Sequence, residues 1–370
     1  MENRDLHKQP IAKIICPNFS GILARERLFE LIHLEQGRLV KWIQGPPGSG
    51  KTTLVADYLK TNQGRHIWYQ IDETDSDLSS FYYYLGLAAE KTSAQATKRL
   101  PLFTPEHRFS LPVFTRKYFQ QFYTLFSPPF TLVFDNYHIQ PVESDLHDIM
   151  RMGIEEAPPG VTIIFISRMP LPQAFRRLQA NNFIDLIGWD DLRLTETEFR
   201  EIAFLRGKEV FSDASLKQAY LKTQGWAAGL VLILERAKIK GIKQINLENL
   251  SFEGIYEYFA TEVLNQSEIQ QQEFLLKSCF LAQMTPAMVN ELTERADAEQ
   301  IISYLYTHHY FLEKHSQKEV IYQYHPLFRD FLKNRANATF SITDLRHTKR
   351  RAAGIFLKEG YPTDAIELIF

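Results

Sequence analysis

One segment constrains the fold of this chain more than any other: residues 45–52 read GPPGSGKT. The segment fits the pattern GxxxxGK[ST] without a mismatch, and it lies between a β-rich run and a helical one, as that pattern requires. Glycines let the backbone curl so that successive N–H groups point at phosphate oxygens, and the positive end of the following helix adds to the attraction. The sequence therefore predicts a phosphate-binding loop (P-loop) that includes Gly45, Pro46, Gly48, Ser49 and Gly50.

The residues that follow supply charge and hydroxyl groups. Lys51 is expected to reach the β- and γ-phosphates, and the hydroxyl of Thr52 is expected to ligate Mg²⁺. Thr53 would contact the α-phosphate. A P-loop also needs a carboxylate at the end of a buried strand, and Asp135 follows the apolar run 131–134. We predict that Asp135 completes the Mg²⁺ site with Thr52.

Two residues that follow predicted strands, Asn136 and Arg168, bear on the hydrolysis of ATP. Asn136 stands where fast ATPases often carry a second carboxylate, and an amide cannot accept a proton from the attacking water. The sequence therefore predicts a slow ATPase. Arg168 follows the apolar run 161–167, whose carboxyl end would face the same crevice in a parallel sheet. We predict that Arg168 senses the γ-phosphate through charge-assisted bonds, and the alternative is an ordinary surface arginine.

The arrangement of apolar runs predicts an α/β P-loop fold with a parallel sheet flanked by helices, then a helical part and a winged helix. Expected strands are residues 39–44, 66–71, 131–134, 161–167 and, more weakly, 183–187. Helical stretches are expected at 52–60, 79–91, 195–240 and 252–306, then a hairpin of 310–314 with 320–324 and a helix at 326–334. We expect a nucleotide-binding domain (1–192), a helical domain (193–248), a winged-helix domain (249–340) and the start of a helical repeat (341–370).

Composition excludes several classes of protein. With 42 Lys and Arg against 44 Asp and Glu, the net charge is -2, so bulk charge does not drive nucleic-acid binding. The two cysteines, Cys16 and Cys279, are far apart and form neither a disulfide framework nor a zinc motif. The longest apolar run, 226–234, is too short to cross a bilayer, and we expect a cytoplasmic protein without membrane contact. The final helix, 364–370, is still apolar where the sequence stops, so we expect it to belong to a longer chain.

Several segments together resemble the STAND class of P-loop NTPases, and within it the MalT-like (LAL) regulators. The resemblance covers nearly the whole chain. It is carried by residues 21–28 (GILARERL), 71–77 (IDETDSD), 135–138 (DNYH), 166–170 (ISRMP), 225–230 (GWAAGL), 324–331 (YHPLFRDF) and 351–366.

The resemblance implies roles for two more residues. Arg25 lies in the segment that helps to hold the adenine in this family. His325 corresponds to the histidine that touches the β-phosphate of ADP in the closed state, although a histidine between aromatic residues is also a common packing residue. The chain departs from the family at Asn136, where the motif has a second Asp. Ala227 stands where plant and animal relatives have Pro, which puts an adenine contact there in doubt.

The family likeness implies a switch that uses ATP, ADP and Mg²⁺. ADP would hold a closed resting form, and ATP would allow self-association when an inducer binds a C-terminal sensor that these residues lack. The basic run 346–351 is interpreted as a solvated helix face, so no direct nucleic-acid binding is expected here. Two alternatives stay open: a working AAA-type ATPase, in which Glu143 substitutes for the missing carboxylate, and the scaffold of a defence protein with an effector elsewhere. A nucleotide kinase is least favoured.

Overall fold

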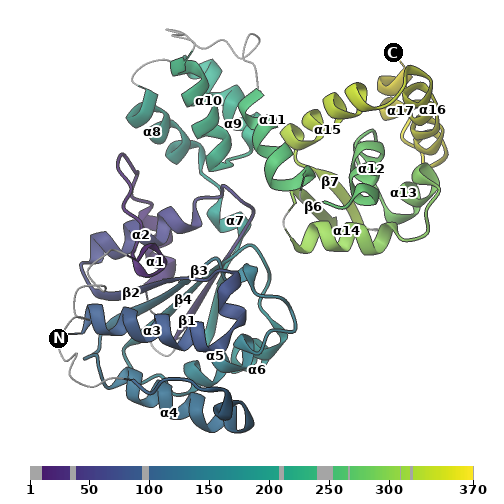
Figure 1. Ribbon diagram of the computed structural model, residues 1–370. Helices are drawn as coiled ribbons and strands as arrows, with labels where there is room; N and C mark the ends of the chain where they lie inside the picture. The colour runs from purple at the N-terminus through teal and green to yellow at the C-terminus, as the bar shows by residue number, and fades with distance from the viewer. Residues whose placement is uncertain are drawn as a thin grey trace. The chain divides into compact units, whose positions relative to one another are not determined.

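The computed structural model describes residues 11–33, 39–93, 100–207, 212–239, 253–265, 267–308, 310–316 and 320–369. These residues form two compact units (Figure 1). The first is drawn from Met1–Gly45 and Ser49–Leu192, and the second from Pro46–Gly48 and Arg193–Phe370. The middle of the predicted P-loop therefore packs as part of the second unit.

The first unit is built on a five-stranded sheet in the order β2-β3-β4-β1-β5, with every neighbouring pair parallel. All five predicted strands are present, and their ends differ from the prediction by at most one residue. The strands are β1 (Val40–Gln44), β2 (Arg65–Gln70), β3 (Phe130–Asp135), β4 (Val161–Ser167) and β5 (Ile184–Ile187).

Helices cover both faces of this sheet, which explains why its strands are nearly continuous apolar runs. Side chains alternate between the faces, so that Trp42 joins one core and Ile43 the other. Helices α3, α4, α5 and α6 pack on the first face, and α1, α2 and α7 on the second. Their bounds are α1 (Glu26–Ile32), α2 (Lys51–Asn62), α3 (Leu78–Thr92), α4 (Leu111–Tyr123), α5 (Leu146–Glu155), α6 (Arg176–Ala180) and α7 (Trp189–Leu192). The 3-10 helices are η1 (Ala12–Ile14), η2 (Glu73–Ser76), η3 (Pro105–Ser110), η4 (Tyr137–Ile139) and η5 (Gln173–Phe175).

The second unit opens with three helices. The first begins with a capping box, in which the backbone N–H of Glu198 donates to Thr195 Oγ1 at 3.2 Å and the N–H of Thr195 donates to Glu198 Oε2 at 2.9 Å. The three helices are α8 (Glu196–Gly207), α9 (Asp213–Thr223) and α10 (Ala227–Ile239).

The rest of the second unit is helical apart from one hairpin. Its helices are α11 (Glu253–Phe259), the π-helix η7 (Ala260–Leu264), α12 (Ile269–Ser278), α13 (Pro286–Thr293), α14 (Ala298–Thr307), α15 (Pro326–Thr339), α16 (Ile342–Lys358) and α17 (Pro362–Ile369). The antiparallel hairpin is β6 (Leu312–Ser316) with β7 (Val320–Tyr324). The basic run 346–351 lies in α16, where Arg346 and Arg350 are exposed and Arg351 pairs with Glu294.

The predicted bounds of two elements in this unit were wrong. The first hairpin strand begins at Leu312 instead of residue 310, because Phe311 has a positive φ of 52° that breaks the extended path. Helix α15 continues to Thr339, five residues beyond the predicted end. The predicted ends at residues 240, 252 and 370, the hairpin turn at 317–319 and the boundary between 248 and 249 lie outside the described residues.

Candidate functional site

The candidate site lies at the carboxyl edge of the parallel sheet. The P-loop connects the end of β1 to α2, while Asp135 ends β3 and Arg168 follows β4. Gly48 and Gly50 have φ values of 72° and 86°, a region that residues with a side chain rarely adopt. The glycines of the motif therefore stand where the backbone requires them, and the crevice at this edge is where open α/β sheets bind ligands.

Lys51 is buried at the start of α2, with 8% of its surface exposed. Its Nζ donates to the Gly45 carbonyl at 2.8 Å and to Ser49 Oγ at 3.2 Å. Burial and then the charge of Arg168 lower the pKa of Lys51 to about 7, against the opposing charge of Asp135. A buried ammonium of this kind favours an anionic partner, which would restore the ordinary pKa.

Thr52 and Asp135 are brought together, as the predicted Mg²⁺ site requires. The distances from Thr52 Oγ1 to the two carboxylate oxygens are 3.2 and 3.3 Å. Burial raises the pKa of Asp135, opposed by a 2.8 Å bond from the Asn136 N–H, by Thr52 and by Lys51. A hydroxyl beside a buried carboxylate fits Mg²⁺, which takes one or two protein oxygens and completes its shell with phosphates and water. Among the described residues no group of three or more His, Cys, Asp or Glu could hold a metal ion.

Arg168 adds a positive charge at this edge, and the neutral His138 lies within its influence. Arg168 is half-buried. Burial, then the charges of Arg168 and Lys51, lower the pKa of His138 to about 3. The Nδ1 atom of His138 is buried without a hydrogen-bond partner. No role for His138 was predicted from the sequence, although the DNYH motif contains it.

Asn136 and Thr53 flank these groups. Asn136 has a left-handed backbone, with φ of 58°, which Asn and Asp tolerate better than other side chains. Thr53 is half-buried in the first turn of α2. Their predicted effects on hydrolysis and on the α-phosphate stay predictions.

Arg25 is occupied within the first unit. It immediately precedes α1, has 8% of its surface exposed, and donates to the Leu192 carbonyl at 2.9 Å. Arg27, two residues on, donates to the Asp191 carbonyl at 2.7 Å. These bonds tie the start of α1 to α7, while the adenine contact of Arg25 stays a prediction.

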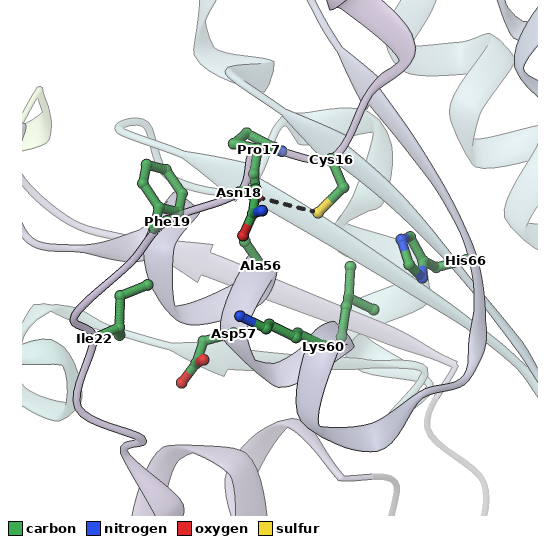
Figure 2. Close-up of a pocket in the computed structure, with 10 residues that line it drawn as sticks. Cys16, Pro17, Asn18, Phe19, Ile22, Ala56, Asp57, Lys60 and His66 are labelled. Carbon is green, nitrogen blue, oxygen red and sulfur yellow. Dashed lines mark hydrogen bonds between the residues drawn. The ribbon is translucent and has the colours of Figure 1, made fainter.

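A separate cavity of about 290 Å³ lies beside α2 and shares no lining residue with the predicted site (Figure 2). Figure 2 shows the Cys16 sulfur at its edge, 3.7 Å from the Pro17 carbonyl that accepts its weak hydrogen bond. Burial and then the charge of Asp135 raise the pKa of Cys16 to about 11, so this thiol is a poor nucleophile. The lining residues are Cys16, Pro17, Asn18, Phe19, Ile22, Ala56, Asp57, Leu59, Lys60 and His66.

His325 belongs to the second unit and immediately precedes α15. It is 3% exposed, and its Nε2 lies 3.0 Å from the Thr223 carbonyl. Because a carbonyl only accepts, Nε2 carries the proton and Nδ1 is a bare acceptor, which is buried without a partner. Burial lowers the pKa of His325 to about 4. A buried acceptor without a partner marks a place where a donor would be favoured.

The parallel sheet, the glycine loop before α2 and the acid at the end of β3 define a P-loop NTPase fold. Residues 260–342 match the MalT winged helix domain family. The chain is 28% identical to the HTH-type transcriptional regulator MalT of Cronobacter sakazakii, over 93% of this chain and 38% of the relative. It is 26% identical to MalT of Serratia proteamaculans, over 92% of this chain and 38% of that relative.

These comparisons confirm the resemblance to MalT-like regulators, and the chain spans 38% of the length of both relatives. Among solved structures, the Aeropyrum pernix Orc1 protein in complex with DNA has a TM-score of 0.45 at 12% identity, over 88% of this chain and 95% of that chain. The Thermotoga maritima RuvB Holliday junction branch migration motor has a TM-score of 0.40 at 14% identity, over 80% of this chain and 88% of that one. Within the described residues, no helix is long and apolar enough to span a membrane.

Proposed function

We propose that this chain is the adenine-nucleotide switch of a MalT-like transcriptional regulator. The observation that carries the proposal is the pairing of Thr52 with the buried Asp135, next to the buried Lys51. The ammonium group would hold the β- and γ-phosphates, and the hydroxyl and the carboxylate would hold Mg²⁺. Arg168 would detect the γ-phosphate, because its charge already acts on Lys51.

The switch rests on different affinities of the two nucleotides for two states. ADP would favour a closed resting form, with His325 on its β-phosphate, and ATP would favour a self-associating form. The inducer, its sensor and the transcriptional output would come from the rest of such a protein, acting in the cytoplasm. The Nδ1 atom of His325 has no proton, so it can only accept a hydrogen bond. To donate to a phosphate oxygen there, His325 must carry a second proton.

Slow hydrolysis is the property that makes a nucleotide a marker of state instead of a fuel. We expect turnover below about 1 s⁻¹, the low end of ordinary enzymes. The variant Asn136→Asp supplies a carboxylate in a backbone conformation that Asp also tolerates, so it should hydrolyse ATP about tenfold faster or more. Asn136→Ser, which offers no carboxylate, is the matched control. Equal rates in both variants would contradict this role of Asn136.

The direct test is to denature the purified protein and identify the released nucleotide by chromatography. One equivalent of ADP supports the resting switch. A nucleotide-free protein that hydrolyses added ATP rapidly would favour the working AAA-type ATPase instead. Binding of ATP or ADP that survives Lys51→Ala would overturn the P-loop role altogether.

A further inference from the structure

Two hydrogen bonds from residues 226 and 228 hold the backbone at the centre of the P-loop. The indole Nε1 of Trp226 donates to the Pro47 carbonyl at 3.0 Å, and the N–H of Ala228 donates to the Gly48 carbonyl at 2.9 Å. Ala228 lies in the first turn of α10, where N–H groups have no partner within the helix. These two bonds satisfy two consecutive carbonyls of the loop and fix the path of its backbone.

Gly48 permits this close approach. A Cβ at position 48 would lie 2.5 Å from the Cβ of Ala228, 3.0 Å from Nε1 of Trp226 and 3.1 Å from the hydroxyl of Tyr258. No side chain fits between the loop and α10. The loop backbone and the start of α10 are therefore in direct contact. Because the contact is close-packed, a movement of Trp226 must displace the backbone of the loop.

Trp226 is also the centre of an aromatic cluster. Its ring is fully buried and stacks on Phe259 at 5.3 Å with an interplanar angle of 14°. Phe311 meets it edge-on at 5.2 Å, Tyr258 lies at 5.3 Å and His325 at 6.4 Å. We call these five residues the Trp226 cluster. Phe311 and His325 belong to the MalT winged helix domain match.

We propose that Trp226 is a positioning residue that transmits the packing of the winged-helix domain to the P-loop backbone, and so sets the affinity for nucleotide. The inference rests on the proposed nucleotide binding. Repacking of Phe311 or His325 changes where the indole N–H lies, and the Pro47 carbonyl follows it. Control of nucleotide affinity thus needs no direct contact between Phe311 and the nucleotide.

The test uses the full chain and replaces the donor alone. β-(3-Benzothienyl)alanine at position 226 keeps the shape of the two fused rings but has no N–H, and Trp226→Phe is the simpler second variant. Losing one hydrogen bond should weaken ADP binding about fivefold, measured by calorimetry well below the thermal midpoint, which the unsatisfied Pro47 carbonyl should lower. Unchanged ADP affinity in both variants would overturn the proposal.

Coupling is tested from the other end of the cluster. Phe311→Leu should weaken ADP binding about twofold, and it should add nothing to Trp226→Phe, because both act through the same bond. Phe280→Leu, a buried residue of the same domain outside the Trp226 cluster, is the control and should leave ADP affinity unchanged. Additive effects of the 226 and 311 changes, or equal effects of the 280 and 311 changes, would overturn the proposal.

A spectroscopic readout separates positioning from mere structural support. The chain has four tryptophans, so 5-fluorotryptophan labelling gives four ¹⁹F signals, and Trp226→Phe identifies one of them. That signal should move when ADP binds, and a signal that ADP leaves unmoved would count against transmission. If the wild-type chain binds no nucleotide, the proposed function itself fails. If it binds ADP and Lys51→Ala abolishes this, but the 226 variants bind normally, only the present inference fails.

Discussion

The sheet edge of the first unit and the Trp226 cluster of the second each bury an ionisable side chain, but in opposite surroundings. Lys51 lies within the influence of other charges, Arg168 and Asp135, and donates to a carbonyl and a hydroxyl of its own loop. His325 lies against aromatic rings and donates to a single carbonyl. Burial lowers the pKa of Lys51 to about 7 and that of His325 to about 4.

The difference between these surroundings determines what each region can respond to. At neutral pH Lys51 exchanges readily between its charged and neutral forms, so an arriving phosphate can select the charged form. His325 is neutral at the same pH, so it would have to gain a second proton before it could donate to a phosphate oxygen. The first region is suited to recognising charge, whereas the second is suited to changing its packing.

The largest expected effect is on the charged side. Lys51→Ala removes the cation beneath the phosphates and should weaken ATP and ADP binding about 100-fold or more, because buried charge-assisted contacts are costly to lose. Calorimetric titration measures this, with the exposed Lys117→Ala of α4 as the control. If nucleotide affinity falls by less than about threefold, the loop is not the phosphate site, and the first region does not recognise charge as described above.

The sequence predicted which residues meet at the charged sheet edge, because the signals for them are local, while their roles toward a nucleotide stay predictions. The P-loop spans eight residues, and Asp135 and Arg168 each follow a strand whose apolar run marks its end. Since parallel strands end at one edge, strand order hardly matters to which residues meet there. His138 was missed because its partners are electrostatic and come from other elements, α2 and the turn after β4.

The second region could not be predicted in the same way. The sequence contains GWAAGL, but nothing near Trp226 indicates that its indole bonds to Pro47, 179 residues away. Phe311 has a positive φ, and the hairpin therefore begins only after it. Packing must fix this conformation as well, since a phenylalanine has no local preference for it. Aromatic packing over long sequence distances sets this region, and periodicity alone cannot reveal it.

The next expected effect is a loss of folding stability in acid, which arises from the neutral, buried His325. The pKa of His325 is about 4 in the folded chain and about 6.5 in an unfolded one, so between these values the unfolded state binds more protons. Stability should therefore fall as the pH drops through this window, by about 2 kcal/mol between pH 7 and pH 5. Urea unfolding at both pH values measures this loss.

His325→Gln is the matched variant for that measurement. Its amide can still donate to the Thr223 carbonyl, but it does not titrate. The variant should lose about 2 kcal/mol less than the wild type between pH 7 and pH 5, which removes the contributions of all other histidines from the comparison. If both proteins lose equal stability, His325 is not the neutral buried group that the contrast requires.

The smallest expected effect is the most specific to the charged side. Without nucleotide, Lys51 has a pKa of about 7, and a bound phosphate should return it towards its ordinary value of 10.5. Between these values binding takes up as much as one proton, so affinity should fall up to about tenfold per pH unit above pH 7. Titration calorimetry at pH 8.5 in HEPPS and in Tris, two buffers without phosphate whose ionisation heats differ, measures the proton uptake. Lys51→Arg, which stays charged, should show none, and buffer-independent heats in the wild type would mean that Lys51 is already charged before the phosphate arrives.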